Sequence, residues 1–142
     1  MTKKITRWLA ALLPAVATAG LLFTGNAAAT TTSSLITFGE CTAHGNFATC
    51  VASGHIHRPS AIYVSVYTQP SHLSVTITWS MVCSKNSGAG QSSGHFTTAT
   101  PRSLRYIAHP YARPGSCDVA AEGQVNGNAQ RIRVWLSAYR WG

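Results

Sequence analysis

Apolar residues occupy every second position of the segment VTITWSMVC, residues 75–83. A period of two predicts a β-strand with one buried face and one solvated face. The same alternation recurs in three other segments, so the sequence predicts four long strands. The residues expected to point into the core are Val75, Ile77, Trp79, Met81 and Cys83; Ile62, Val64 and Val66; Cys117, Val119, Ala121 and Val125; and Ile132, Val134, Leu136 and Ala138.

Shorter and weaker strand patterns occupy residues 47–52, 95–99 and 103–108. Turn-forming residues separate the strands, at Gln69-Pro70, 86–90, Arg113-Pro114-Gly115 and Asn126-Gly127. No helical period of 3.6 residues follows residue 30. About seven strands joined by short turns therefore predict one all-β domain, an antiparallel β-sandwich.

The first 29 residues have the pattern of a secretory signal peptide. Lys3, Lys4 and Arg7 precede an uncharged run over 8–23, and the small residues 27–29 suit cleavage after Ala29. The uncharged run is shorter than the ~20 residues of a spanning helix. We therefore expect a signal peptide at 1–29, a folded domain at 30–142, no transmembrane segment after cleavage, and a secreted, extracellular or cell-wall-associated protein.

The composition is poor in charge and basic. Charged residues make up 10% of the 142 residues, and the formal net charge is +8. Beyond residue 29, eight Lys/Arg face three carboxylates, which leaves a charge of +5. This excess favours an anionic wall polymer, a polysaccharide or an extracellular protein as partner. It includes no run of five or six basic residues, so it does not favour nucleic acid.

Four cysteines follow the predicted cleavage site. An even number in an exported domain predicts two disulfides, and four cysteines allow three pairings. We favour Cys41–Cys50, which flanks a short glycine-containing loop, and Cys83–Cys117, which joins two alternating segments. No Cys-x-x-Cys spacing points to zinc.

Residues 78–83 and 115–120 resemble the two strands of an immunoglobulin-type domain, which an inter-sheet disulfide joins beside a tryptophan. The leader, the short N-terminal cysteine loop and the Trp-x-x-x-Cys strand are also similar to small, mostly uncharacterised secreted proteins of actinobacteria. The resemblance implies export and an immunoglobulin-like β-sandwich. It carries no catalytic residue over to this chain.

Alternation also predicts which side chains point away from the core. On the two strands around Val64 and Val134, serines, aromatic residues and arginines take the outward positions. The outward residues expected to form a binding platform for sugar rings or a protein surface are Tyr63, Tyr67, Arg131, Arg133, Trp135 and Tyr139. The alternatives are that the aromatic rings cover neighbouring strands as cross-strand pairs, or lie under the segment before Cys41.

His55 and His57 are candidate metal ligands, because an i,i+2 spacing on a strand places two imidazoles on one side. A third ligand would be His44 or a residue that folding brings in. The other interpretation is ordinary surface histidines, and no cofactor is expected.

Catalytic motifs are scarce. Three carboxylates argue against a glycoside hydrolase, and no Gly-x-Ser-x-Gly elbow is present. Glu122, His95 and Arg131 supply the residue types of a ribonuclease without a supporting spacing. We therefore predict a secreted, non-catalytic β-sandwich that binds polysaccharide or protein. The alternatives are an effector or inhibitor acting through 95–100 and 109–115, and a small hydrolase.

Overall fold

The computed structural model describes residues 34–86, 88–99 and 104–142. The predicted signal peptide at 1–29 and the start of the predicted domain at residue 30 lie outside these residues. None of the described residues forms a helix of the length and apolarity needed to cross a membrane.

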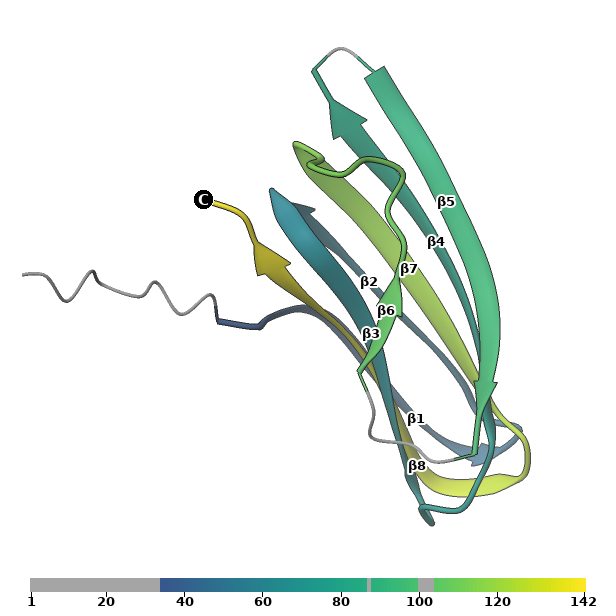
Figure 1. Cartoon of the computed structure of the whole chain (residues 1–142). Helices are drawn as coiled ribbons and strands as arrows, with labels where there is room; N and C mark the ends of the chain where they lie inside the picture. The colour runs from purple at the N-terminus through teal and green to yellow at the C-terminus, as the bar shows by residue number, and fades with distance from the viewer. Residues whose placement is uncertain (1–33, 87, 100–103) are drawn as a thin grey trace, which may run out of the picture. The chain divides into compact units, whose positions relative to one another are not determined.

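The described residues form eight strands in two antiparallel sheets, which pack face to face (Figure 1). The order is β1-β8-β3-β6 in one sheet and β2-β7-β4-β5 in the other. The predicted antiparallel β-sandwich is confirmed, with eight strands rather than about seven. The strands are β1 (Ile36–Asn46), β2 (Thr49–His57), β3 (Pro59–Gln69), β4 (Val75–Lys85), β5 (Gly88–Thr98), β6 (Arg105–Ile107), β7 (Ser116–Val125) and β8 (Asn128–Arg140).

The core fills the space between the sheets and consists of the inward residues of the four alternating segments. Ile77 of β4, Ile62 of β3, Ala121 of β7 and Val134 of β8 are all completely buried. Trp79 is half-buried, packs on this core, and lies against Gly94 of β5, where a β-carbon would come within 2.8 Å of its ring. The predicted inward faces of β3, β4, β7 and β8 are therefore confirmed.

Strand β1 has no counterpart in the sequence prediction. It is an edge strand, and none of its residues is fully buried. Its pairing with β8 shifts register twice, between Thr37 and Gly39 and between Ala43 and Gly45. Because each shift interrupts the period of two, the apolar alternation that reveals a strand is missing here.

The two predicted disulfide pairings are confirmed, and one predicted location is wrong. Cys83 and Cys117 face each other across neighbouring strands of the same sheet, with Cα atoms 4.1 Å apart. The resemblance to immunoglobulin domains implied an inter-sheet bond at this place. The bond between the sheets is instead Cys41–Cys50, which joins β1 to β2. Cys83–Cys117 lies within a sheet because β4 and β7 are hydrogen-bonded neighbours.

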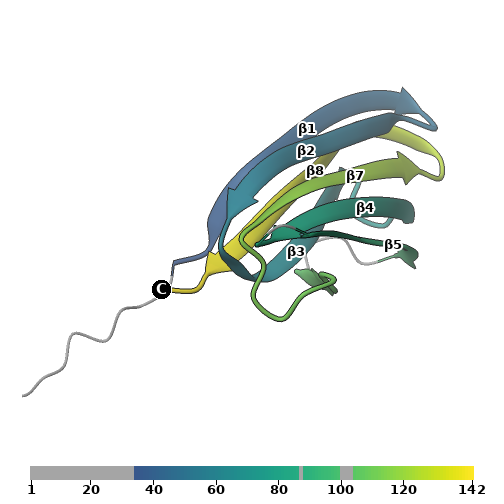
Figure 2. The same ribbon diagram turned by 90° about the horizontal axis from the view of Figure 1, so that it is seen from above.

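Strands β1 and β2 come very close where this inter-sheet bond lies, and Figure 2 shows them side by side at one edge of the sandwich. Two glycines allow the approach. A β-carbon on Gly39 would come within 2.5 Å of the Ser53 carbonyl oxygen, and one on Gly54 would collide with the Phe38 carbonyl. The edge is therefore closed by backbone contact as well as by a disulfide.

Gly54→Ala should destabilise the domain by about 1–3 kcal/mol, because the added methyl has no room beside the Phe38 backbone. Urea unfolding followed by tryptophan fluorescence measures the change. Ser53→Ala, at the exposed neighbouring position, is the control and should have little effect. Equal stability of Gly54→Ala and the wild type would contradict the close contact.

Removing Cys83–Cys117 should cost more stability than removing Cys41–Cys50. The first bond has a sequence separation of 34 and the second of 9, and loop closure of about 35 and about 10 residues stabilises by roughly 3.8 and 2.7 kcal/mol. The two paired Cys→Ala variants, compared by urea unfolding, test this order. A larger loss for Cys41→Ala/Cys50→Ala would show that joining the sheets matters more than loop length.

Candidate functional site: the outer face of the β1-β8-β3-β6 sheet

All six residues predicted to form a platform lie on β3 and β8, which are paired neighbours in the same sheet. Their alternation with core residues directs them to the outer face, and none of them belongs to the buried core. Register places Tyr67 opposite Arg133, and Tyr63 opposite Ser137. The six therefore share one face and fall into two groups along the strands.

The first group lines a hollow of about 350 Å³ on this face. We call it the arginine–tryptophan hollow, and its lining residues are Tyr67, Arg131, Arg133 and Trp135. Arg131 is exposed, and the other three side chains are half-buried. The part of the predicted platform that these four residues form is therefore concave and not flat. Aromatic rings and guanidinium groups line it.

Arg133 is held in place from two sides. Its Nη2 and Nε atoms donate to Oε2 of Glu40, at 2.6 and 3.2 Å. Its guanidinium carbon lies 5.0 Å from the centre of the Trp135 ring. The ion pair is partly exposed, so it adds at most about 1 kcal/mol of stability. The ion pair orients Arg133 beside Trp135 and neutralises the charge of Arg133.

Arg131 differs from Arg133 in having no carboxylate beside it. Within the described residues it forms no ion pair. Register pairs it with the uncharged Gln69 of β3. The hollow therefore carries a net positive charge, and Arg131 provides it.

The second group is a tyrosine cluster on the same face, made of Tyr63, Tyr106 and Tyr139. The Tyr63 ring meets the rings of Tyr106 and Tyr139 edge to face, each with centroids 6.0 Å apart. Tyr106 of β6 pairs with Tyr63 in register. Tyr63 and Tyr139 thus cover neighbouring strands, as the cross-strand alternative expects, and neither lines the hollow.

Two outward serines are buried on this face, although alternation predicts exposure. Ser65 and Ser137 keep only 2% and 1% of their surface. Ser65 lies opposite Trp135, and Ser137 lies opposite Tyr63. The large neighbouring rings account for their burial. Residues 36–40, directly before Cys41, do not cover the platform, because β1 lies beside β8 in the same sheet.

The sequence interpretation missed two residues of this face, Glu40 and Tyr106. Glu40 belongs to the unrecognised strand β1, where it lies opposite Trp135. Tyr106 lies in a strand of only three residues, and 52% of its surface is exposed. No local pattern marks either residue, because both reach the site through strand pairing.

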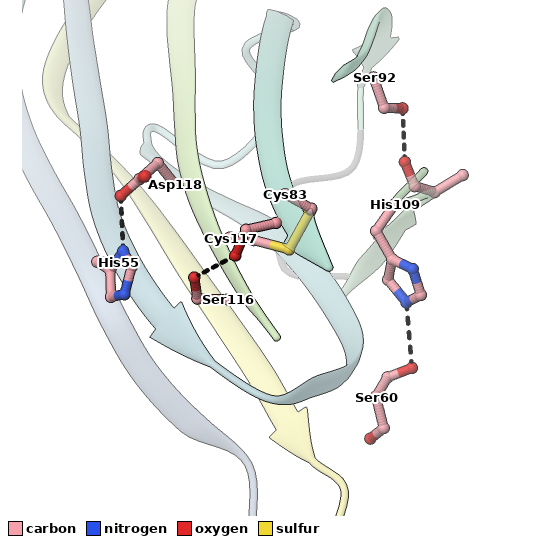
Figure 3. The surroundings of a disulfide bond; sticks show 10 residues. His55, Ser60, Cys83, Ser92, His109, Ser116, Cys117 and Asp118 are labelled. Carbon is pink, nitrogen blue, oxygen red and sulfur yellow. Dashed lines mark hydrogen bonds and ion pairs between the residues drawn. A yellow bond between two sulfur atoms is a disulfide. The ribbon is translucent and has the colours of Figure 1, made fainter. Parts of the chain in front are cut away.

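The candidate metal ligands His55 and His57 lie on β2, in the other sheet, with ring centroids 4.8 Å apart. The residue that folding brings to them is Asp118, whose Oδ1 is 2.7 Å from Nδ1 of His55 (Figure 3). Among the described residues, no group of three or more His, Cys, Asp or Glu side chains is placed to hold a metal ion. His44 therefore does not complete a three-ligand site.

The residues considered for a ribonuclease do not come together. Glu122 of β7 and His95 of β5 both lie opposite Thr78 of β4, on its two sides. Two strand spacings, about 10 Å, therefore separate their backbones. Arg131 lies in the other sheet. A second hollow, of about 460 Å³, lies on this β2-β7-β4 surface, and its lining includes Ser53, Ser80 and Ala120.

No protein-family model and no curated protein matches the sequence. Two solved structures are similar to the chain. One comes from work on the promiscuous specificity of carbohydrate-binding modules of the β-sandwich superfamily; it is 8% identical, with a TM-score of 0.37, and the match covers 79% of this chain and 58% of that one. The other is TmCBM61 in complex with β-1,4-galactotriose, which is 11% identical, with a TM-score of 0.37, over 77% of this chain and 90% of that one. At these values the likeness says nothing about what this chain binds.

Proposed function

We propose that this chain is an extracellular, non-catalytic binding module that holds a negatively charged polysaccharide in the arginine–tryptophan hollow. The observation that carries the proposal is the joint presence, in one hollow, of two aromatic rings and an arginine without a carboxylate partner among the described residues. The two disulfides support an oxidising compartment outside the cell.

The aromatic side chains suit a sugar ring. Trp135 and Tyr67 are half-buried, so each is fixed by packing and still presents surface to solvent. An apolar ring face of this kind can cover the C–H face of a sugar, while the polar groups around it fix orientation. The hollow volume of about 350 Å³ is near the lower end, roughly 300 Å³, of small-molecule sites. It suits one or two sugar units of a longer chain.

The net positive charge of the hollow favours an acidic polymer over a neutral one as the ligand. Glu40 already neutralises Arg133, whereas Arg131 is exposed and unpaired within the described part of the chain. A guanidinium group binds carboxylate, sulfate and phosphate oxygens with two parallel hydrogen bonds. A ligand that stacks on Trp135 and places an anionic group at Arg131 uses both features.

The distribution of carboxylates supports binding rather than hydrolysis. Glycoside hydrolases use two carboxyl groups that flank the scissile bond, about 5–10 Å apart. Of the three carboxylates in the sequence, Glu40 is engaged with Arg133, and Asp118 and Glu122 lie in the other sheet. The hollow therefore has one carboxylate near it, and that one is occupied.

Trp135→Ala should weaken polysaccharide binding at least tenfold, about 1.4 kcal/mol, because it removes the stacking surface. Affinity electrophoresis in gels that contain polygalacturonate, dextran sulfate or phosphorylated dextran measures the effect and separates carboxylate, sulfate and phosphate ligands. Tyr106→Ala is the matched control, an exposed aromatic on the same face outside the hollow. Unchanged retention of Trp135→Ala on the polymer that binds the wild type would overturn the site.

Arg131→Ala should weaken binding to the anionic polymer and reduce the dependence of affinity on salt, because one exposed charge contact is lost. Lys85→Ala makes the same change in net charge on β4, in the other sheet, and should bind like the wild type. If Arg131→Ala and Lys85→Ala weaken binding equally, the attraction is a property of net charge and not of the hollow. If the protein binds only neutral glycans, the proposed acidic ligand is wrong, and the hollow stays the proposed binding site.

A further inference from the structure

The backbone that carries the two histidines of β2 is held firmly in place. His55 and His57 flank Ile56, of which only 1% is exposed, so the strand cannot rotate without uncovering the core. Ile56 also pairs in register with Cys117, which is tied by a disulfide to Cys83 of β4. Both imidazoles therefore project into solvent from a backbone that is held by a buried side chain and by a neighbouring strand that is itself cross-linked.

Asp118 decides which nitrogen of His55 is available. It lies opposite His55 in register, and its Oδ1 is 2.7 Å from Nδ1. An ionised carboxylate only accepts hydrogen bonds, so Nδ1 of His55 donates to Asp118. Nε2 of His55 then carries no proton and points away from Asp118. Figure 3 shows Asp118 turned toward His55. A carboxylate that holds the second nitrogen of a histidine in this way is the usual outer partner of a metal-binding imidazole.

The spacing of the two rings suits a shared ion. An imidazole bound at a metal–nitrogen distance of ~2.0–2.1 Å has its ring centre about 3.2 Å from the metal, so two such rings lie about 4.5 Å apart at a right angle and about 5.2 Å apart in a tetrahedral site. The observed separation is 4.8 Å. His57 is exposed and forms no hydrogen bond or ion pair within the described residues, and its ring meets the His55 ring edge to face, so rotation of this exposed ring can bring a nitrogen toward an ion beside His55.

We propose that His55 and His57 chelate a divalent transition-metal ion, with Cu(II) bound most tightly and with Asp118 as a positioning residue. Cu(II) accepts tetragonal sites made of nitrogen and oxygen ligands and stands at the top of the affinity order for such sites. Solvent oxygens complete the coordination, because the described part of the chain brings no third His, Cys, Asp or Glu side chain into position. The site lies in the opposite sheet from the arginine–tryptophan hollow, so it is independent of polysaccharide binding.

Isothermal titration of the protein with CuCl2, NiCl2 or ZnCl2 at neutral pH tests the site. We expect one ion per chain, bound in the order Cu(II) before Ni(II) and Zn(II), and an electron paramagnetic resonance spectrum of bound Cu(II) with coupling to two imidazole nitrogens. His55→Ala and His57→Ala should each remove this binding. His44→Ala and His72→Ala change exposed histidines elsewhere and are the matched controls, which should keep it.

Asp118→Asn separates a positioning role from a merely structural one. It should weaken Cu(II) binding about 10- to 100-fold, and the spectrum at saturation should still show two imidazole nitrogens. The proposal is overturned if no ion binds, if His44→Ala or His72→Ala removes the binding, or if His57→Ala leaves it unchanged.

Discussion

Burial of one face of β8 is the constraint on which the candidate site depends. Ile132, Val134, Leu136 and Ala138 are all completely buried between the sheets. Strand β8 is also a central strand, with β1 on one side and β3 on the other. A slip of one residue would move every one of these side chains to solvent and turn Arg133 and Trp135 into the core, so the apolar face fixes the orientation of the polar one. The core thereby specifies the site without contributing an atom to it.

The alternation of apolar residues predicts which face of each strand is buried, but it does not predict which strands pair. It places Trp135 and Arg133 outside because each strand's own inward residues decide its orientation, whatever its partners are. It says nothing of Glu40, which reaches Arg133 over a separation of 93 residues through the pairing of β1 with β8. The inter-sheet position of Cys41–Cys50 was missed for the same reason, since it depends on β1 and β2 belonging to different sheets.

The two outer faces of the sandwich differ in charge. One carries Arg131 and the ion pair of Arg133 with Glu40. The other carries Asp118 and Glu122 on β7, with His55 and His57 on the neighbouring strand β2. Because β7 and β8 belong to different sheets, Asp118 and Glu122 project to the opposite side from Arg131 and Arg133. Among the described residues, the arginine–tryptophan hollow therefore has no acidic neighbour other than Glu40, whereas Asp118 of β7 lies beside His55 on the other face.

The closed edge of the sandwich explains why an edge strand can hold the backbone of a ligand pair in a fixed position. Edge strands fray when one side of the backbone has no partner. Strand β2 is paired with β7 along its whole length, and its other side meets β1 at Gly54 and at the Cys41–Cys50 bond. His55 follows Gly54 directly, so the ligand pair begins where the backbone is most confined. Such confinement lowers the conformational entropy that a ligand would otherwise have to remove on binding, which favours affinity from only two protein ligands.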